Sequence, residues 1–264
     1  MSGPALWVIE RSGTKVHLFG ETVGVVDDTW LTDPIQDAVD GSAEFWCEVA
    51  DAQEIAQSPL LARYGLSSEP LSERLSPSAR SSLQDACRAL DVDPASLEEL
   101  RPWLAAQLLE HVLRSRDGID AGVSVHEVLL ARAKQAGKTI RTELPDIDAT
   151  LSFFDTMPWA VESEYLLWTA DRVTADPDEI VRQVSAWTRG DPSVVDEQLA
   201  QMQARYPNLY KYLILDRNRA WVPRIDAMLD RGNSFVLVGD SHMTTGDGIP
   251  NLLTLGGFNP RSAA

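Results

Sequence analysis

The sequence predicts an α/β fold in which a central sheet, formed from the N-terminal and C-terminal segments, is flanked and capped by a largely helical middle region. Two observations support this prediction. Short apolar runs bounded by turn residues occur at 15–19, 45–49 and 233–238, which is typical of buried strands. Between about 60 and 215, helix-capping patterns dominate instead. We therefore expect residues 1–264 to form a single domain whose helical insertion or cap spans about 60–215.

The first and last of these runs lead directly into glycines. Residues 15–19 precede Gly20, and residues 233–238, the clearest strand signal in the chain, precede Gly239. Between the first two strands, Asp33-Pro34 is expected to open a helix, because proline is favoured in the first helical turn.

Pairs of a capping residue and a proline mark the helices of the middle region. A Ser or Asp side chain accepts a hydrogen bond from the first turn, and proline fits the first helical position. Such pairs predict helices that begin at Ser76-Pro77, Asp93-Pro94, Asp176-Pro177 and Asp191-Pro192. The helix after Asp93 is expected to reach about Val112, because its apolar residues recur at three- and four-residue spacing.

Other helix boundaries carry their own signals. Ser124-Val125-His126-Glu127 is a capping box that begins a helix, and Gly137 ends that helix before a short strand at 138–143. A helix at about 148–171 is expected to break or kink at Pro158.

The last long helix is predicted over 218–230. It contains Pro223, which a helix tolerates near its first turn, and it ends at Gly232.

Composition narrows the class of partner. The net charge of −17 would repel nucleic acids and anionic membranes at long range, which leaves a small-molecule or peptide substrate as the expected partner. The two cysteines, Cys47 and Cys87, have no metal-binding spacing and fit a reducing compartment. No signal-peptide pattern and no run of 18 apolar residues occurs, so a cytoplasmic location is expected.

Two predicted strand ends carry similar short motifs. Gly20-Glu21-Thr22-Val23 and Gly239-Asp240-Ser241-His242 each place an acid and a hydroxyl residue after a glycine. In open α/β sheets, residues just beyond the carboxyl ends of strands face the ligand crevice. The repeat therefore predicts one shared pocket, in which Ser241 is expected to contact substrate.

His242 is the first candidate for chemistry in that pocket. A neutral imidazole near pH 7 serves either as a general base or as a metal ligand. Asp240 and Glu21 either ligate a cation, orient His242 or contact substrate, or they cap the elements that follow them. Glu48 and Glu143 each follow a buried strand, where an unpaired acid would be costly, so they also point to a pocket.

Markers spread over nearly the whole chain carry a resemblance to a known family. They are the strand-end motif after Leu18-Phe19, Glu48, Gly118-Ile119-Asp120, Ala136-Gly137-Lys138 before Glu143, Phe154-Asp155-Thr156-Met157-Pro158, Arg217-Asn218-Arg219-Ala220-Trp221, and Val238-Gly239-Asp240-Ser241-His242 with Gly246, Gly248 and Leu252. In this order and spacing they resemble the TraB/GumN family, which includes the Tiki metalloproteases and lies near ChaN-like haem-binding and erythromycin-esterase-like proteins.

The resemblance implies a pocket that collects two GxxH motifs, two glutamates and an Arg-Asn pair. Carried onto this chain, it implies catalytic roles for His242, Glu48, Glu143 and Arg217 and a substrate-binding role for Asn218. Val23 stands where the family has the first histidine. A metal would then be held by His242, Glu48 and Glu21, and such a carboxylate-rich set favours manganese, magnesium or calcium over zinc. The alternatives are a site without metal, and an Arg217 that merely neutralises the two glutamates.

The implied activity is hydrolysis of a peptide, ester or related acyl bond by activated water. Because Val23 breaks one motif, two other functions remain open. One is a protein that binds a small molecule such as haem without catalysis. The other is an enzyme of specialised metabolism, a cyclase or dehydratase that reuses the pocket.

Overall fold

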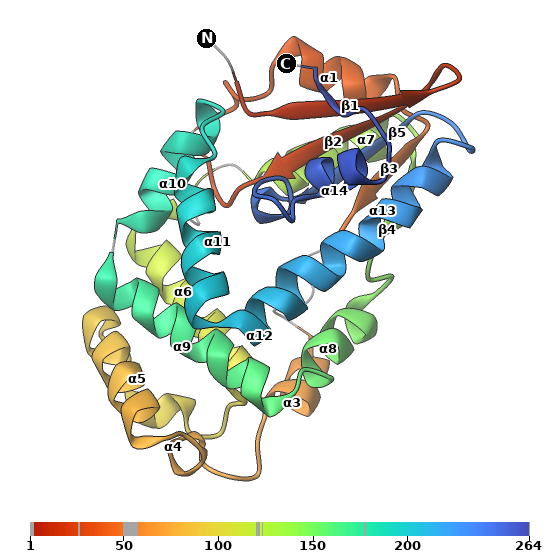
Figure 1. Cartoon of the computed structure of the whole chain (residues 1–264). Helices are drawn as coiled ribbons and strands as arrows, with labels where there is room; N and C mark the ends of the chain where they lie inside the picture. Colours follow the sequence, from red (N-terminus) through yellow and green to blue (C-terminus); the bar gives the residue numbers. More distant parts are fainter. Residues whose placement is uncertain are drawn as a thin grey trace.

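Strands from both ends of the chain form one mixed sheet in the computed structural model, which describes residues 3–25, 27–49, 58–119, 122, 124–176 and 178–263 (Figure 1). The strand order is β4-β3-β5-β2-β1-β6. The bounds are β1 Leu6–Arg11, β2 Thr14–Glu21, β3 Glu44–Cys47, β4 Thr139–Thr142, β5 Ser234–Gly239 and β6 Arg261–Ser262. The predicted α/β fold is confirmed, with the middle region contributing the edge strand β4.

Four strands end on the same edge of the sheet. Strands β2, β5, β3 and β4 run parallel to one another, whereas β1 is antiparallel to both β2 and β6. The register pairs Glu21 with Gly239 and Cys47 with Thr142. The amide of Glu143 also bonds to the Cys47 carbonyl at 2.8 Å. Residues that directly follow these strands, Glu48 among them, therefore meet at one edge.

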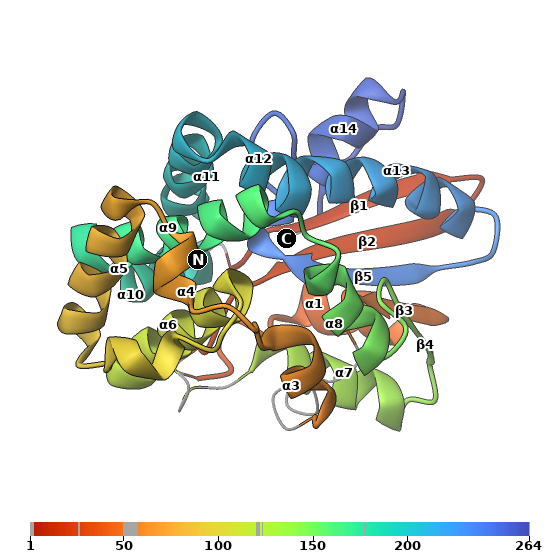
Figure 2. The ribbon, with the colours of Figure 1, turned by 90° about the horizontal axis from the view of Figure 1, so that it is seen from below.

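Helices cover both faces of the sheet (Figure 2). One face buries Phe19, Phe45 and Phe235 against α1 and α7, and the other buries Val236 and Val238 against α13 and α14. Apolar residues thus alternate between two covered faces, as expected for a largely parallel sheet. The bounds are α1 Asp33–Asp40, α7 Val125–Gln135, α13 Asp216–Met228 and α14 Ile249–Leu255.

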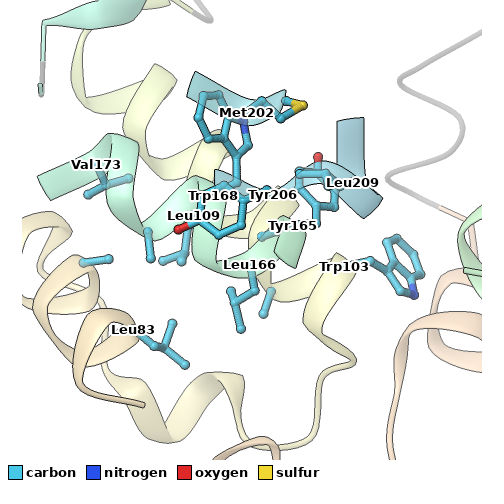
Figure 3. Close-up of a cluster of buried hydrophobic side chains, with 14 of the residues drawn as sticks. Leu83, Trp103, Leu109, Tyr165, Leu166, Trp168, Val173, Met202, Tyr206 and Leu209 are labelled. Carbon is cyan, nitrogen blue, oxygen red and sulfur yellow. The ribbon is translucent and has the colours of Figure 1, made fainter. Parts of the chain in front are cut away.

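The remaining helices pack together as a helical region beyond the carboxyl edge of the strands (Figure 1). Their own core includes Trp168, Met202 and Tyr206, which lie close together in Figure 3, and it extends through Leu109 and Leu166. The helices are α3 Leu60–Gly65, α4 Leu71–Arg74, α5 Pro77–Leu90, α6 Pro102–Arg116, α8 Ile147–Asp155, α9 Trp159–Ala175, α10 Glu179–Thr188, α11 Ser193–Arg205 and α12 Pro207–Tyr210. The division into one domain with a cap at about 60–215 stays a prediction.

Several predicted helix boundaries are confirmed. The hydroxyl of Ser76 accepts from the Ala79 amide, and that of Ser124 accepts from the Glu127 amide, each at 3.2 Å. Pro158 separates α8 from α9. Of the predicted boundary and family markers, Asp120 and Pro177 lie outside the described residues.

The helix predicted from Asp93 to about Val112 is wrong in its first part. Asp93 caps only a 3₁₀ turn at Pro94–Leu97, and the long helix α6 starts at Pro102. Arg101 adopts an extended backbone with φ −67° and ψ 151°. The cause is Pro102, because the residue before a proline is disfavoured in the helical region.

The last helix differs from prediction at its start and at its proline. α13 begins at Asp216 and follows a π-helical segment, Lys211–Leu215, so that Pro223 lies inside the helix rather than in its first turn. Pro223 and Arg219 are both exposed. The carbonyl of Arg219, which lacks its usual donor at position 223, therefore lies on the solvent side, where water can satisfy it.

Within the described residues, no helix is long and apolar enough to span a membrane. Cys47 and Cys87 are buried free thiols.

Candidate functional site

The carboxyl edge of the sheet brings the predicted acids to the second strand-end motif. Glu48 follows β3, and its Oε1 accepts a hydrogen bond from the Gly239 amide at 2.9 Å. Gly239 ends β5, and Asp240, Ser241 and His242 form a 3₁₀ turn directly after it. The link between Glu48 and Gly239 therefore joins the ends of two neighbouring parallel strands.

The first strand-end motif packs closely against the second. A side chain at Gly20 would place its Cβ 2.9 Å from Met243 Cγ and 3.0 Å from Asp240 Cα. The Gly20 carbonyl accepts a hydrogen bond from Trp187 Nε1 at 2.8 Å. Glycine is thus required at this position by the close approach of the turn at 240–242.

Arg217 is the centre of the charged cluster. Its Nη2 lies 2.5 Å from Glu143 Oε2 and 3.1 Å from Glu48 Oε2, and its Nε donates to Glu143 Oε1 at 3.4 Å. Its Nη1 lies 3.2 Å from His242 Nε2. The guanidinium carbon sits 5.6 Å from the centre of the Phe153 ring. Burial opposes the charge of Arg217, but Glu48 and Glu143 outweigh burial and raise its pKa.

Arg217 and Asn218 reach the site from the first turn of α13, directly after the π-helical segment. Such π segments are frequent at functional sites. The two neighbouring residues contact the two ring nitrogens of His242: Arg217 contacts Nε2, and Asn218 Oδ1 contacts Nδ1 at 2.6 Å. One helical turn therefore fixes the orientation of the imidazole.

The hydrogen bonds of Asn218 also define the tautomer of His242. Its Nδ2 donates to the Asp247 carbonyl at 2.8 Å, and a carbonyl can only accept, so Oδ1 is the atom that faces His242. Oδ1 in turn can only accept, which places the ring proton on Nδ1. The neutral imidazole is thereby left with its lone pair on Nε2, where Arg217 donates.

Burial and charge set the ionisation of Glu48 and His242. Burial alone would raise the pKa of Glu48, but Arg217 and the Gly239 amide outweigh it and lower the pKa to about 2. Burial lowers the pKa of His242 to about 4; Glu48, with Oε1 at 3.3 Å from Nε2, opposes this shift, and Arg217 adds to it. At neutral pH the site therefore holds an ionised glutamate beside an uncharged imidazole.

The other two predicted acids have different partners. Glu21 Oε1 lies 3.2 Å from His126 Nδ1, and burial raises the pKa of Glu21. Asp240 accepts from Gln183 Nε2 at 3.0 Å and 3.4 Å. Burial raises the pKa of Asp240 to about 6, opposed by Gln183. The imidazole of His242 instead contacts Arg217, Asn218 and Glu48, so neither acid orients it directly.

A cavity of about 340 Å³ opens at the charged cluster. Glu48, Arg217, Asp240, Ser241 and His242 line its sheet side. Val23 also lines this cavity and is 39% exposed. The cavity thus receives all four residues of the second strand-end motif, Gly239 to His242, and Val23 from the first. Trp221 is fully buried in the core against the sheet.

The cluster does not fit a divalent metal in this arrangement. A cation shared by Glu48 and His242 Nε2 would occupy the position that the Arg217 guanidinium holds. Glu21, the third expected ligand, is bonded to His126. Within the described part of the chain, no group of three or more His, Cys, Asp or Glu residues is placed to hold a metal ion.

Several residues at the site were not anticipated from the sequence. His126 was visible only as part of a capping box, and Gln183 and Phe153 only as helix residues. Their neighbours in the site are far away in the chain, and no local pattern indicates these contacts.

Comparison with known proteins identifies one family. The model of the TraB/PrgY/gumN family matches residues 5–262, nearly the whole chain. No match was found among curated proteins, and none among solved structures. The site residues predicted from the resemblance thus lie within the matched region, and the chain belongs to the TraB/PrgY/gumN family.

Proposed function

We propose that this protein is a hydrolase that cleaves an ester, amide or related acyl bond with water activated by His242. One observation carries the proposal. The imidazole of His242 is uncharged at neutral pH, its proton is fixed on Nδ1 by Asn218, and its basic Nε2 lies beside the cavity that Glu48 and Arg217 line. An oriented neutral imidazole beside a cation is the arrangement that general-base acyl transfer uses.

Arg217 has one nitrogen suited to an oxyanion. Nη2 and Nε are engaged by Glu143 and Glu48, whereas Nη1 contacts His242. When a substrate carbonyl oxygen enters the cavity, it competes with Nε2 for the Nη1 donor. The carbonyl is then polarised, and the lone pair of Nε2 is released toward a water molecule.

The reaction follows from these positions. His242 Nε2 removes a proton from water, the water oxygen bonds to the acyl carbon, and Arg217 Nη1 stabilises the oxyanion. Ionised Glu48 stabilises the imidazolium from 3.3 Å. Collapse of the intermediate breaks the bond to the leaving atom, which takes the proton from Nε2, and the acid product leaves.

The test compares two histidine variants on p-nitrophenyl esters and peptide anilides. His242→Ala should abolish turnover while circular dichroism stays unchanged, because it removes the imidazole nitrogen that takes the proton from water. His111→Ala, at an exposed position of α6, is the matched control and should keep full activity. Undiminished hydrolysis by His242→Ala would contradict the proposal.

A second measurement tests whether the mechanism needs a metal. We expect chelation to leave activity unchanged, because the Arg217 guanidinium supplies the positive charge at the site. One tightly bound transition metal per chain, together with activity lost on chelation and restored by that metal, would refute the general-base version.

The haem-binding alternative has weaker support from the geometry. Both ring nitrogens of His242 are engaged, and ligation of iron through Nε2 would require Arg217 and Glu48 to give up their contacts. Titration with haem distinguishes this role, since a saturable Soret shift that His242→Ala removes would favour it.

A further inference from the structure

The helices that line the cavity contribute a set of apolar side chains beside several polar ones. These apolar side chains belong to the helical region beyond the sheet edge and to the π-helical segment. They are Phe154, Trp168, Ile180, Leu199, Met202 and Ile214. Trp168 and Met202 lie together in Figure 3 at this part of the helical core. A ligand that extends from Arg217 into the cavity therefore meets aliphatic and aromatic surface.

The charged residues of this wall are already paired with one another. Arg172 lies 3.2 Å from Glu110 and 2.5 Å from Glu179, and the Tyr165 hydroxyl contacts Glu110 at 3.5 Å. Arg114, which also lines the cavity, has a partner as well.

The amides of the same wall are engaged too. Gln183 donates to Asp240 and accepts from Gln198 at 3.2 Å. A charged group entering from the substrate would have to break such a pair and remain largely desolvated, which is costly. The wall therefore selects an uncharged group.

The volume sets the size of that group. The cavity measures about 340 Å³, and one water molecule takes about 30 Å³ of liquid, so the cavity holds about eleven water-sized groups. The scissile carbonyl and the attacking water occupy two or three of these places. About eight remain for methylene-sized groups.

Resting on the proposed hydrolase function, we infer that the substrate is a neutral acyl compound whose apolar group has about eight to ten carbons and lies against Trp168, Ile180 and Met202. Each buried methylene contributes about 0.8 kcal/mol, which corresponds to an about fourfold increase in kcat/KM. This gain stops when the cavity is full.

Two ester series test the inference with wild-type protein. In one series the acyl chain of p-nitrophenyl esters runs from two to sixteen carbons, and in the other the alcohol chain of acetate esters does. We expect kcat/KM to rise in one of them by about threefold to fourfold per methylene and to peak near eight to ten carbons. If hydrolysis that depends on His242 is independent of chain length in both, the inference is overturned while the proposed function stands.

Variants that fill the cavity make the test specific to this wall. Ile180→Trp and Leu213→Trp should move the optimum to shorter chains by several carbons. Leu213 is half-buried and tolerates the larger side chain if the fully buried Ile180 does not. Val181→Trp is the control, because Val181 lies next to Ile180 on α10 but is 45% exposed and lines a different cavity. An unchanged optimum in both folded variants would overturn the inference.

Binding by the inactive His242→Ala protein separates the inference from the proposed function. The probes are decanamide and its derivative with a carboxylate at the far end, and the readout is tryptophan fluorescence with Trp168 in the cavity wall. We expect decanamide to bind at least tenfold more tightly than the charged derivative. Equal binding of the two, or no saturable binding of decanamide, would overturn the inference even if esters are hydrolysed. Binding of decanamide without any hydrolysis by wild-type protein would uphold the neutral apolar site and refute the hydrolase.

Discussion

The carboxyl group of Asp240 should make the stability of this protein depend on pH in a predictable way. Burial raises its pKa from 3.8 to about 6, against the hydrogen bond from Gln183, and the charge of Glu21 adds to the rise. A raised folded-state pKa means that the folded chain binds more protons than the unfolded chain between these two pH values. The stability that this protonation contributes is fully present below about pH 4 and is lost as the pH rises through about 6.

The size of the effect follows from the shift. Each pKa unit corresponds to about 1.4 kcal/mol, so the difference between 3.8 and about 6 amounts to about 3 kcal/mol. This is an upper value, because the side chain of Asp240 is only half-buried and solvent reduces the cost of its charge. Asp240→Asn keeps the shape and a hydrogen bond to Gln183 but carries no charge. Its free energy of unfolding, relative to wild type, should therefore improve by as much as about 3 kcal/mol between pH 4 and pH 8.

Urea unfolding of both proteins at pH values from 4 to 8 measures this difference directly. The contributions of other titrating groups cancel to first order, because they are shared by the two proteins. A pH-independent difference for Asp240→Asn would show that the folded protein does not hold this carboxyl in its neutral form.

Three further predictions concern the same edge of the sheet. The acid limb of kcat/KM should have its midpoint near pH 4, the pKa to which burial lowers His242, and a midpoint near 6.5 would contradict this. Glu48→Gln should move the midpoint to lower pH, because Glu48 favours the imidazolium. Asn218→Asp should raise that midpoint, because a buried carboxylate beside Nδ1 stabilises the protonated ring, and the pH profile of hydrolysis checks this. Gly20→Ala should lower the free energy of unfolding by about 1–3 kcal/mol in urea, because its Cβ would lie 2.9 Å from Met243 Cγ.

The sequence was sufficient to predict the edge of the sheet where the site lies. Apolar runs predict β2, β3 and β5, and parallel strands place the residues that follow them on one edge. Strand β1 was not predicted, although Ser12-Gly13, with φ angles of 52° and 86°, forms a two-residue turn between β1 and β2. A Ser-Gly pair marks a turn, and it could have indicated the end of a strand before residue 12.

The pairing of the acids was not predictable from local patterns. Glu21 meets His126 across 105 positions of sequence, and Asp240 meets Gln183 across 57. Each of these partners lies on a helix whose packing, rather than its own sequence, decides which side chain reaches the sheet edge. The capping box that contains His126 predicts where α7 begins, and it carries no information about the strand that the helix will face.

The arrangement around Arg217 also determines what a histidine at position 23 could do. An imidazole at position 23 would line the same cavity as the Arg217 guanidinium, which already neutralises Glu48 and Glu143 and contacts His242. Val23 lines the cavity with an apolar side chain, so His242 supplies the imidazole that contacts the Arg217 guanidinium. The cluster therefore resembles a self-contained acid, base and cation set more than a metal centre that has lost a ligand.

On this reasoning, Val23→His should not by itself create a metal site, because Arg217 would still hold the position that an ion requires. Metal titration of Val23→His and of Val23→His combined with Arg217→Met decides the point: only the double variant is expected to bind manganese stoichiometrically, and stoichiometric binding by the single variant would refute the reasoning.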